Sequence, residues 1–304
     1  MKRKFFILVA AVAGLLSATG ASAEKLRVAA TIPLLGDLAR QVGGDAVEVI
    51  DLLKPGGELH HFEPTASDLG RMRGVRVVLA SGKHLESYLD KLKDSLGSSV
   101  KIVEVGKTIP SLKIDPDNAV FMCCPEHMKG GIDPHWWHSA ENMARAARIV
   151  RDELAAADPA NAGGFRSRGD AAAGRYRSLK AEAERQLAVI PKADRKLVTA
   201  HAAFGYFCRE FGFKFVPLLG VSAEEDYSPK WVAEAVKIIR ENNVKAVFPE
   251  TQANPKILKE ITRETGVAVG SPLNADGTGA GAGSTFEGML RQNVAAIVKA
   301  YTGR

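Results

Sequence analysis

The hydrophobic and polar positions of the chain alternate between two kinds of pattern. Short apolar runs rich in β-branched residues are each followed by a segment with helical periodicity. The predicted strands cover residues 26–31, 47–53, 75–80, 100–105, 196–200, 215–218, 244–248 and 267–269. The predicted helices cover residues 34–42, 65–72, 85–96, 140–156, 202–211, 229–242, 255–265 and 286–301. Such alternation is typical of βαβ units, so we expect an α/β fold of mainly parallel sheets flanked by helices.

One helical pattern, between residues 160 and 190, is much longer than the others. Apolar residues from Phe165 to Ile190 recur at helical spacing and form a single stripe, and Pro191 ends the pattern. A helix of that length would reach about 45 Å, farther than one small lobe. The order of elements is the same before and after it. We therefore predict an N-terminal lobe in residues 24–158, a connecting helix in 159–190 and a C-terminal lobe in 191–304.

The N-terminal segment has the three parts of a secretory signal. Lys2, Arg3 and Lys4 precede an apolar stretch of residues 5–16, and Ala21-Ser22-Ala23 has the small residues of a cleavage site. The apolar stretch is shorter than the roughly 20 residues that span a bilayer. No cysteine follows it directly, which argues against a lipid-anchored precursor. We predict a signal peptide in residues 1–23, cut after Ala23, and a periplasmic protein.

The charge of the remaining chain is mild. The formal net charge of +6 falls to +3 when the three charges of Lys2, Arg3 and Lys4 are removed. Such a small excess indicates no nucleic-acid partner, and we expect a monomer.

Three cysteines make an odd count, and two of them lie in a long loop without regular pattern, residues 106–131. Cys123 and Cys124 are adjacent and would pair with each other only under strain, so a bridge from one of them to Cys208 is easier. The pairing stays open. The loop from Cys123 to His127 is either a disulfide-tied surface loop or an auxiliary metal-capture site.

Histidines occur near three predicted strand ends. His60 and His61 follow the second strand after a glycine turn, His135 follows a loop and precedes a helix, and His201 directly follows the strand 196–200. In open α/β sheets, ligands bind in the crevice beyond the carboxyl ends of the strands. One histidine at such a place is usually structural, whereas three predict a shared metal site.

Neutral imidazole suits zinc, copper, iron and nickel. A carboxylate ligand should also follow a strand, and Asp276 and Glu250 do so. Asp133 and Glu63 are either acceptors for the N–H groups of ligand histidines or local caps. The glycine-rich segment 277–283 lacks the lysine of a phosphate-binding loop and is interpreted as a flexible loop.

Several motifs together carry a family resemblance over nearly the whole mature chain. They are the segment 55–68, Asp133-Pro134-His135, the segment 201–206, Phe248-Pro249-Glu250, and Asp276 ahead of the segment 286–293. With these motifs the chain resembles the metal-binding solute-binding proteins of ABC importers, the zinc/manganese cluster (A-I) with two lobes on one long helix.

The resemblance implies a ligand set and a partner. The ligands would be His60, His135, His201 and Asp276, with His61 as the alternative to His60 because Gly-Glu-Leu-His replaces the usual Asp-Pro-His. Relatives that favour manganese place Glu at the position of His201. A shell of three nitrogens and one oxygen suits tetrahedral Zn²⁺ better, so zinc is the expected cargo and Mn²⁺ the alternative. The expected partner is the membrane permease of an ABC importer, and no catalysis is implied.

Two other functions fit parts of the pattern. A secreted zinc hydrolase would need an open metal position and a general base, for which Glu250 is the candidate. A carrier of a metal chelate would need a larger cleft lined by aromatic residues.

Overall fold

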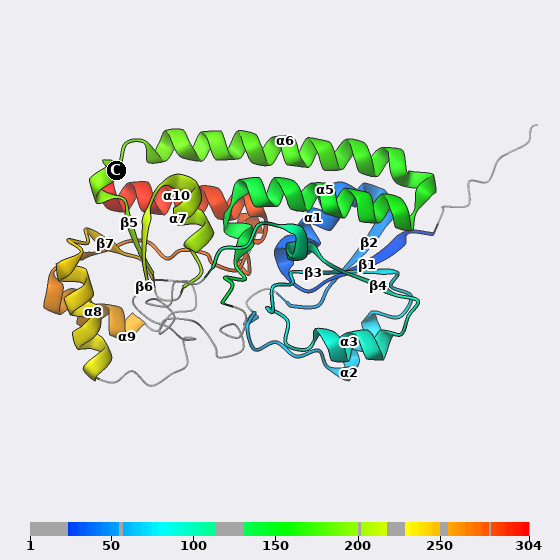
Figure 1. The fold of residues 1–304 in the computed structure, drawn as a ribbon, viewed down its shortest axis with the longest axis horizontal. Helices are drawn as coiled ribbons and strands as arrows, with labels where there is room; N and C mark the ends of the chain where they lie inside the picture. The colour runs from blue at the N-terminus through cyan, green and yellow to red at the C-terminus, as the bar shows by residue number, and fades with distance from the viewer. Residues whose placement is uncertain are drawn as a thin grey trace, which may run out of the picture.

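Two α/β lobes lie side by side beneath one long helix, α6 (Ala162–Leu187), which runs over both (Figure 1). The structure is a computed structural model, and it describes residues 24–54, 57–113, 131–199, 202–217, 229–249, 255–279 and 281–303. The predicted signal peptide in residues 1–23 and the loop residues 114–130 lie outside this description. The predicted fold class is confirmed, while the division of the chain at residues 158 and 191 stays a prediction.

The N-terminal lobe contains a four-stranded parallel sheet in the order β2-β1-β3-β4. Its strands are β1 (Leu26–Ala30), β2 (Val47–Asp51), β3 (Val77–Ala80) and β4 (Lys101–Glu104). Its helices are α1 (Pro33–Gly43), α2 (Ala66–Arg71) and α3 (Leu89–Leu96). Thr65 is the N-cap of α2, where it and Asp68 form a capping box.

The C-terminal lobe repeats this strand order. Its strands are β5 (Lys196–Thr199), β6 (Lys214–Pro217), β7 (Ala246–Val247) and β8 (Ala268–Val269). The pairs β5–β6 and β7–β8 are parallel, and a parallel bridge from Thr199 to Phe248 joins them in the order β6-β5-β7-β8. Its helices are α7 (Gly205–Phe211), α8 (Pro229–Glu241) and α9 (Pro255–Thr265).

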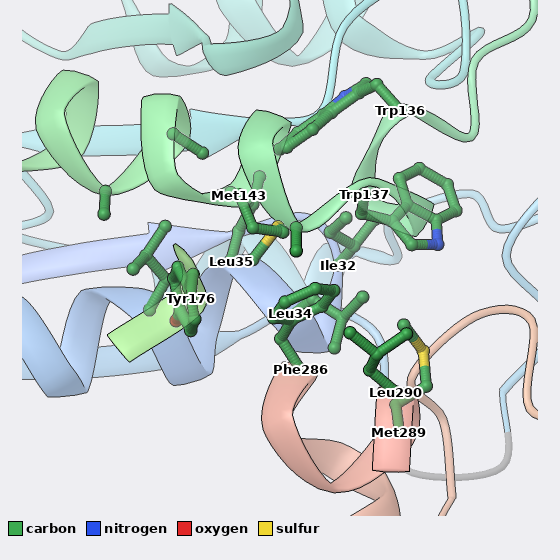
Figure 2. Packing of buried hydrophobic residues seen from close by; sticks show 14 of the residues in the cluster. Ile32, Leu34, Leu35, Trp136, Trp137, Met143, Tyr176, Phe286, Met289 and Leu290 are labelled. Carbon is green, nitrogen blue, oxygen red and sulfur yellow. The ribbon is translucent and has the colours of Figure 1, made fainter. Parts of the chain in front are cut away.

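A common core under α6 connects the two lobes. Helices α5 (Ala140–Ala157) and α10 (Phe286–Thr302) lie along α6, and α1 lies beneath α5 (Figure 1). One cluster of buried apolar side chains extends through these helices and both sheets. Figure 2 shows part of it, with Tyr176 of α6 near Phe286 of α10; their ring centroids are 5.1 Å apart. Each sheet also has a separate apolar cluster away from this core.

The structure corrects the start of one predicted helix. The pattern predicts a helix over residues 85–96, but α3 begins only at Leu89. Lys83 and His84 before it form a left-handed turn, with φ angles of 57° and 63°. The buried carboxylate of Glu86 stabilises this turn, because it accepts hydrogen bonds from the Thr31 hydroxyl and from the backbone N–H of Ser81, both at 2.6 Å.

Two further helices differ from the prediction by more than one residue at an end. The long helix occupies residues 162–187 rather than 160–190, and α7 begins at Gly205 rather than at residue 202. Among the described helices, none has the length and apolar character needed to cross a membrane.

Candidate metal centre

Among the predicted ligands that the structure describes, His135 is fully buried and firmly held. It lies just before the short 3-10 helix Trp136–His138. One carboxylate oxygen of Asp133 accepts a hydrogen bond from the His135 backbone N–H at 2.9 Å and lies 2.8 Å from ring atom Nδ1. Asp133 is therefore both a local cap and an acceptor for the imidazole. With Nδ1 occupied in this way, Nε2 is the atom that His135 presents to a metal.

His60 lies opposite His135. The Nε2 atoms of the two rings are 3.4 Å apart, and the ring planes meet nearly edge to face. Glu58 holds this turn, because its two carboxylate oxygens accept hydrogen bonds from the backbone N–H groups of His60 and His61. The His61 side chain is 57% exposed, and its Nδ1 lies 2.9 Å from Glu58. Of the two adjacent histidines, His60 is the one that faces His135.

Asp276 completes the described group. It lies in the loop between β8 and α10, far from both histidines in sequence. One ligand atom from each of His60, His135 and Asp276 can be chosen so that all three lie within 4.8 Å of one another. Among the described residues, this is the group of histidine, cysteine and acidic side chains with the spacing of a metal site. Two nitrogens and a carboxylate oxygen form a donor set suited to a divalent transition metal.

The remaining predicted ligands, His201 and Glu250, lie outside the described residues. The strand before His201 ends at Thr199, which is buried, and α7 begins shortly after it. Phe204, in that turn, packs against the ring of His138 with centroids 4.3 Å apart. His138 is thus a buried packing residue behind the site.

The C-terminal lobe holds the Asp133 segment in place through residues that the sequence analysis missed. The hydroxyl of Tyr206 donates to the carbonyl of Asp133 and accepts from the N–H of Leu112. Gly205 allows this approach, since a Cβ atom there would lie 2.6 Å from the Asp133 carboxylate. Tyr206 was part of a recognised motif, but no local pattern indicated its partner.

Glu210 fixes the start of α5 from α7. Its carboxylate accepts hydrogen bonds from the Ser139 hydroxyl and from the N–H groups of Ala140 and Glu141. Burial raises the pKa of the Glu210 carboxyl above its ordinary value, and these hydrogen bonds offset part of the rise. A carboxylate at a helix N-terminus is a favourable arrangement. Glu210 thereby connects α7 to the helix that follows His135.

Cys208, on the same helix, is a buried free thiol whose pKa is raised by burial. Cys123 and Cys124, with the candidate capture loop around His127, lie outside the described residues.

Comparisons with known proteins show which family the chain belongs to. A family model described as "ZnuA: Zinc-uptake complex component A periplasmic" matches residues 28–300. The chain is 31% identical over 293 residues to the manganese-binding lipoprotein MntA of Bacillus subtilis (strain 168), covering 93% of this chain and 92% of that protein. It is 29% identical over 282 residues to the iron-binding protein YfeA of Yersinia pestis, covering 92% of this chain and 88% of that protein.

A solved structure has the same architecture. The periplasmic zinc-binding protein TroA from Treponema pallidum superposes with a TM-score of 0.80 at 27% identity, covering 91% of this chain and 99% of that one. These relatives are transport proteins, which excludes the hydrolase considered from the sequence. The chain belongs to the ZnuA family of periplasmic metal-binding proteins, the substrate-binding components of ABC importers.

Proposed function

We propose that this protein binds Zn²⁺ between its two lobes and delivers it to the permease of an ABC importer. The observation that carries the proposal is the group His60, His135 and Asp276, two imidazoles and a carboxylate from segments far apart in sequence. The orientation of His135 by Asp133 is the arrangement that metal-binding histidines usually have. The 3.4 Å between the two Nε2 atoms suits a bare ion better than a bulky chelate.

His201 is the proposed fourth ligand. It is four residues from Gly205, where an added Cβ atom would lie 2.6 Å from the Asp133 carboxylate, so only a short chain segment separates it from a residue beside Asp133. With His201 the shell would contain three nitrogens and one oxygen, which favours tetrahedral Zn²⁺ over Mn²⁺. A manganese carrier is the second candidate, because the manganese-binding MntA is 31% identical to this chain.

The experiment is a metal competition on mature protein stripped with a chelator. Zn²⁺, Mn²⁺ and Fe²⁺ are offered together without oxygen, and the bound metal is measured by mass spectrometry. We expect one zinc per chain. Manganese or iron at equal supply would overturn the choice of zinc, and no bound metal would overturn the site.

His135→Ala tests the ligand set. We expect its zinc dissociation constant to rise at least about 100-fold, because a buried ligand with a fixed partner is lost. His61→Ala is the matched control, since this exposed neighbour points away from the site, and we expect a change of less than about threefold. Equal losses in both variants would contradict the assignment.

We also propose that the exported form begins after Ala23 and is a monomer. The basic, apolar and small-residue parts of residues 1–23 support the cut. The intact mass of protein recovered from the periplasm identifies the cleavage site, and light scattering gives the oligomeric state.

A further inference from the structure

The loop that carries Asp276 is held by side-chain hydrogen bonds on both sides of the aspartate, from α10 and from within the loop. Just before it, Asn274 and Asn293 of α10 form two hydrogen bonds: the Asn274 N–H donates to the Asn293 side-chain oxygen, and the Asn293 amide donates back to the Asn274 carbonyl. Just after it, the Gly277 N–H donates to the Asn274 side-chain oxygen at 2.9 Å. Both asparagines are buried.

One more contact reaches this loop, and it comes from the His135 side of the site. The indole N–H of Trp137 donates to the carbonyl of Ala275, the residue directly before Asp276, at 2.8 Å. The ring of Trp137 also lies edge to face with the His135 imidazole, with centroids 5.3 Å apart. Trp137 is fully buried beside Ile32, and Leu290 of α10 lies on the same side of the cluster (Figure 2).

These contacts make Trp137 the direct link between two proposed ligands that are distant in sequence. An aspartate side chain is short, so the position of its backbone decides where its oxygens lie. Metal–ligand distances tolerate deviations of only about 0.2 Å. A hydrogen bond on the adjacent carbonyl therefore controls whether the Asp276 oxygen and His135 Nε2 reach the same ion.

We propose that Trp137 is a positioning residue: its indole N–H holds the Asp276 loop at the distance from His135 that zinc requires. This inference rests on the proposed function, because it assigns Trp137 a role in the same site. The effect passes through Asp276, which separates the proposal from a simple packing role for a buried tryptophan.

The chain offers a matched control in the neighbouring residue. Trp136 lies in the same 3-10 turn, is also fully buried, and also uses its indole N–H in hydrogen bonding. Its acceptors are the hydroxyl and carbonyl oxygens of Ser81, in the N-terminal lobe, rather than the Asp276 loop. The Trp136 ring packs edge to face on Trp137, with centroids 6.1 Å apart, and phenylalanine keeps an aromatic ring there. Trp136→Phe thus removes an equivalent N–H without removing the hydrogen bond to the Asp276 loop.

The test measures zinc affinity by chelator competition for Trp137→Phe and Trp136→Phe, each alone and combined with Asp276→Ala. We expect Trp137→Phe alone to raise the dissociation constant about 10-fold, and Trp136→Phe to change it less than about twofold. In the Asp276→Ala background, Trp137→Phe should change the zinc dissociation constant less than about twofold, because the residue through which Trp137 affects the metal is already missing. The melting temperatures of the metal-free proteins should fall in both phenylalanine variants, since both lose a buried hydrogen bond.

An unchanged affinity in Trp137→Phe, or an equal loss with and without Asp276, would overturn the proposal. If the unmodified protein binds no zinc, the proposed function fails instead, and the two failures are distinguishable. If Trp137→Phe does not fold, 3-benzothienylalanine at position 137 replaces only the N–H by sulfur and keeps the ring shape. The same 10-fold loss is then expected, and its absence overturns the proposal.

Discussion

The two imidazoles that face each other across the site are held in very different ways. His135 is fully buried, is oriented by Asp133, and lies on a segment that α7 contacts through Tyr206 and Glu210. His60 is only half-buried, and the contact that shapes its turn comes from Glu58, two residues away. We call the region around His135 the anchored side of the site, and the turn of residues 58–61 the outer turn.

This difference indicates which of the proposed ligands are positioned before the metal binds. The Asp276 loop belongs to the anchored side, because Trp137 and Asn293 tie it to the His135 turn and to α10. Such contacts keep ligands close to metal-binding geometry before metal arrives, which lowers the cost of ordering them on binding. In the outer turn, the described backbone hydrogen bonds go to Glu58 within the same segment. We therefore expect the metal to contribute more to the ordering of this turn. Variants on the anchored side should therefore change affinity more than variants in the outer turn.

Among residues that support the proposed ligands rather than bind the metal, the largest effect is expected from Asp133→Ala. The buried His135 ring loses the acceptor at its Nδ1 atom, so its Nε2 atom is no longer held toward the metal. We expect the zinc dissociation constant to rise about 10- to 100-fold, measured by chelator competition. Asp133→Asn keeps an acceptor oxygen and should fall between this variant and the unmodified protein. If the zinc affinity of Asp133→Ala stays within about twofold of that of the unmodified protein, Asp133 is not needed to hold His135 for zinc binding.

A substitution of Asp37, away from the proposed ligands, should change the stability of the protein without changing its zinc affinity. Asp37 of α1 lies against the start of α10, where it accepts a hydrogen bond from the Phe286 N–H. The Gln41 side-chain amide donates to both Asp37 and Glu287. A nitrogen of Arg175 lies 3.8 Å from a Glu287 oxygen, and the charge of Arg40 lowers the pKa of Asp37. Burial, and next the charge of Glu287, raise the pKa of Asp37 from 3.8 to about 6.

The sign of the resulting pH dependence follows from this shift. Between about pH 4 and pH 6 the folded state holds a proton at Asp37 that the unfolded state has released, so stability falls as the pH rises through this window. Asp37→Asn removes the charge and keeps an acceptor for the Phe286 N–H. At pH 7.5 we expect it to be more stable than the unmodified protein by about 1–2 kcal/mol, a figure reduced from the full shift because Asp37 is partly exposed.

Denaturant unfolding of the metal-free proteins at pH 4, 6 and 7.5 measures this difference, which should vanish near pH 4. Zinc affinity at pH 7.5 should stay unchanged, because Asp37 does not contact the ligands. A stability difference that is constant with pH would contradict the role of Asp37.

The smallest effect is expected from Glu58→Ala in the outer turn. The backbone N–H groups of His60 and His61 lose their shared acceptor, but both can then bond to water because the turn is partly exposed. We expect zinc to bind about three- to fivefold more weakly, corresponding to about 1 kcal/mol of lost ordering. Stopped-flow release to a chelator should show most of the change in the dissociation rate. If Glu58→Ala weakens binding more than Asp133→Ala, the division into an anchored side and an outer turn is wrong.

Local patterns were enough to predict most of the fold. The stripe that buries Phe165 and Tyr176 on α6 and the alternation of strands and helices both depend on residues close together in sequence. The start of α3 was wrong for the opposite reason. Its left-handed turn depends on Glu86 reaching Thr31 of another strand end, which no window of neighbouring residues contains.

The sequence by itself determined which segments could supply ligands. His60, His135 and Asp276 were predicted because each follows the end of a predicted strand or a loop beside one, and strand ends of parallel sheets meet at a common edge. Only the tertiary structure decided the rest: that His60 rather than His61 faces His135, that Glu58 shapes the outer turn, and that Trp137 reaches Ala275. The physical reason is that side-chain direction and hydrogen-bond partners across 138 positions of sequence depend on how whole elements pack, and local periodicity carries no information about that packing.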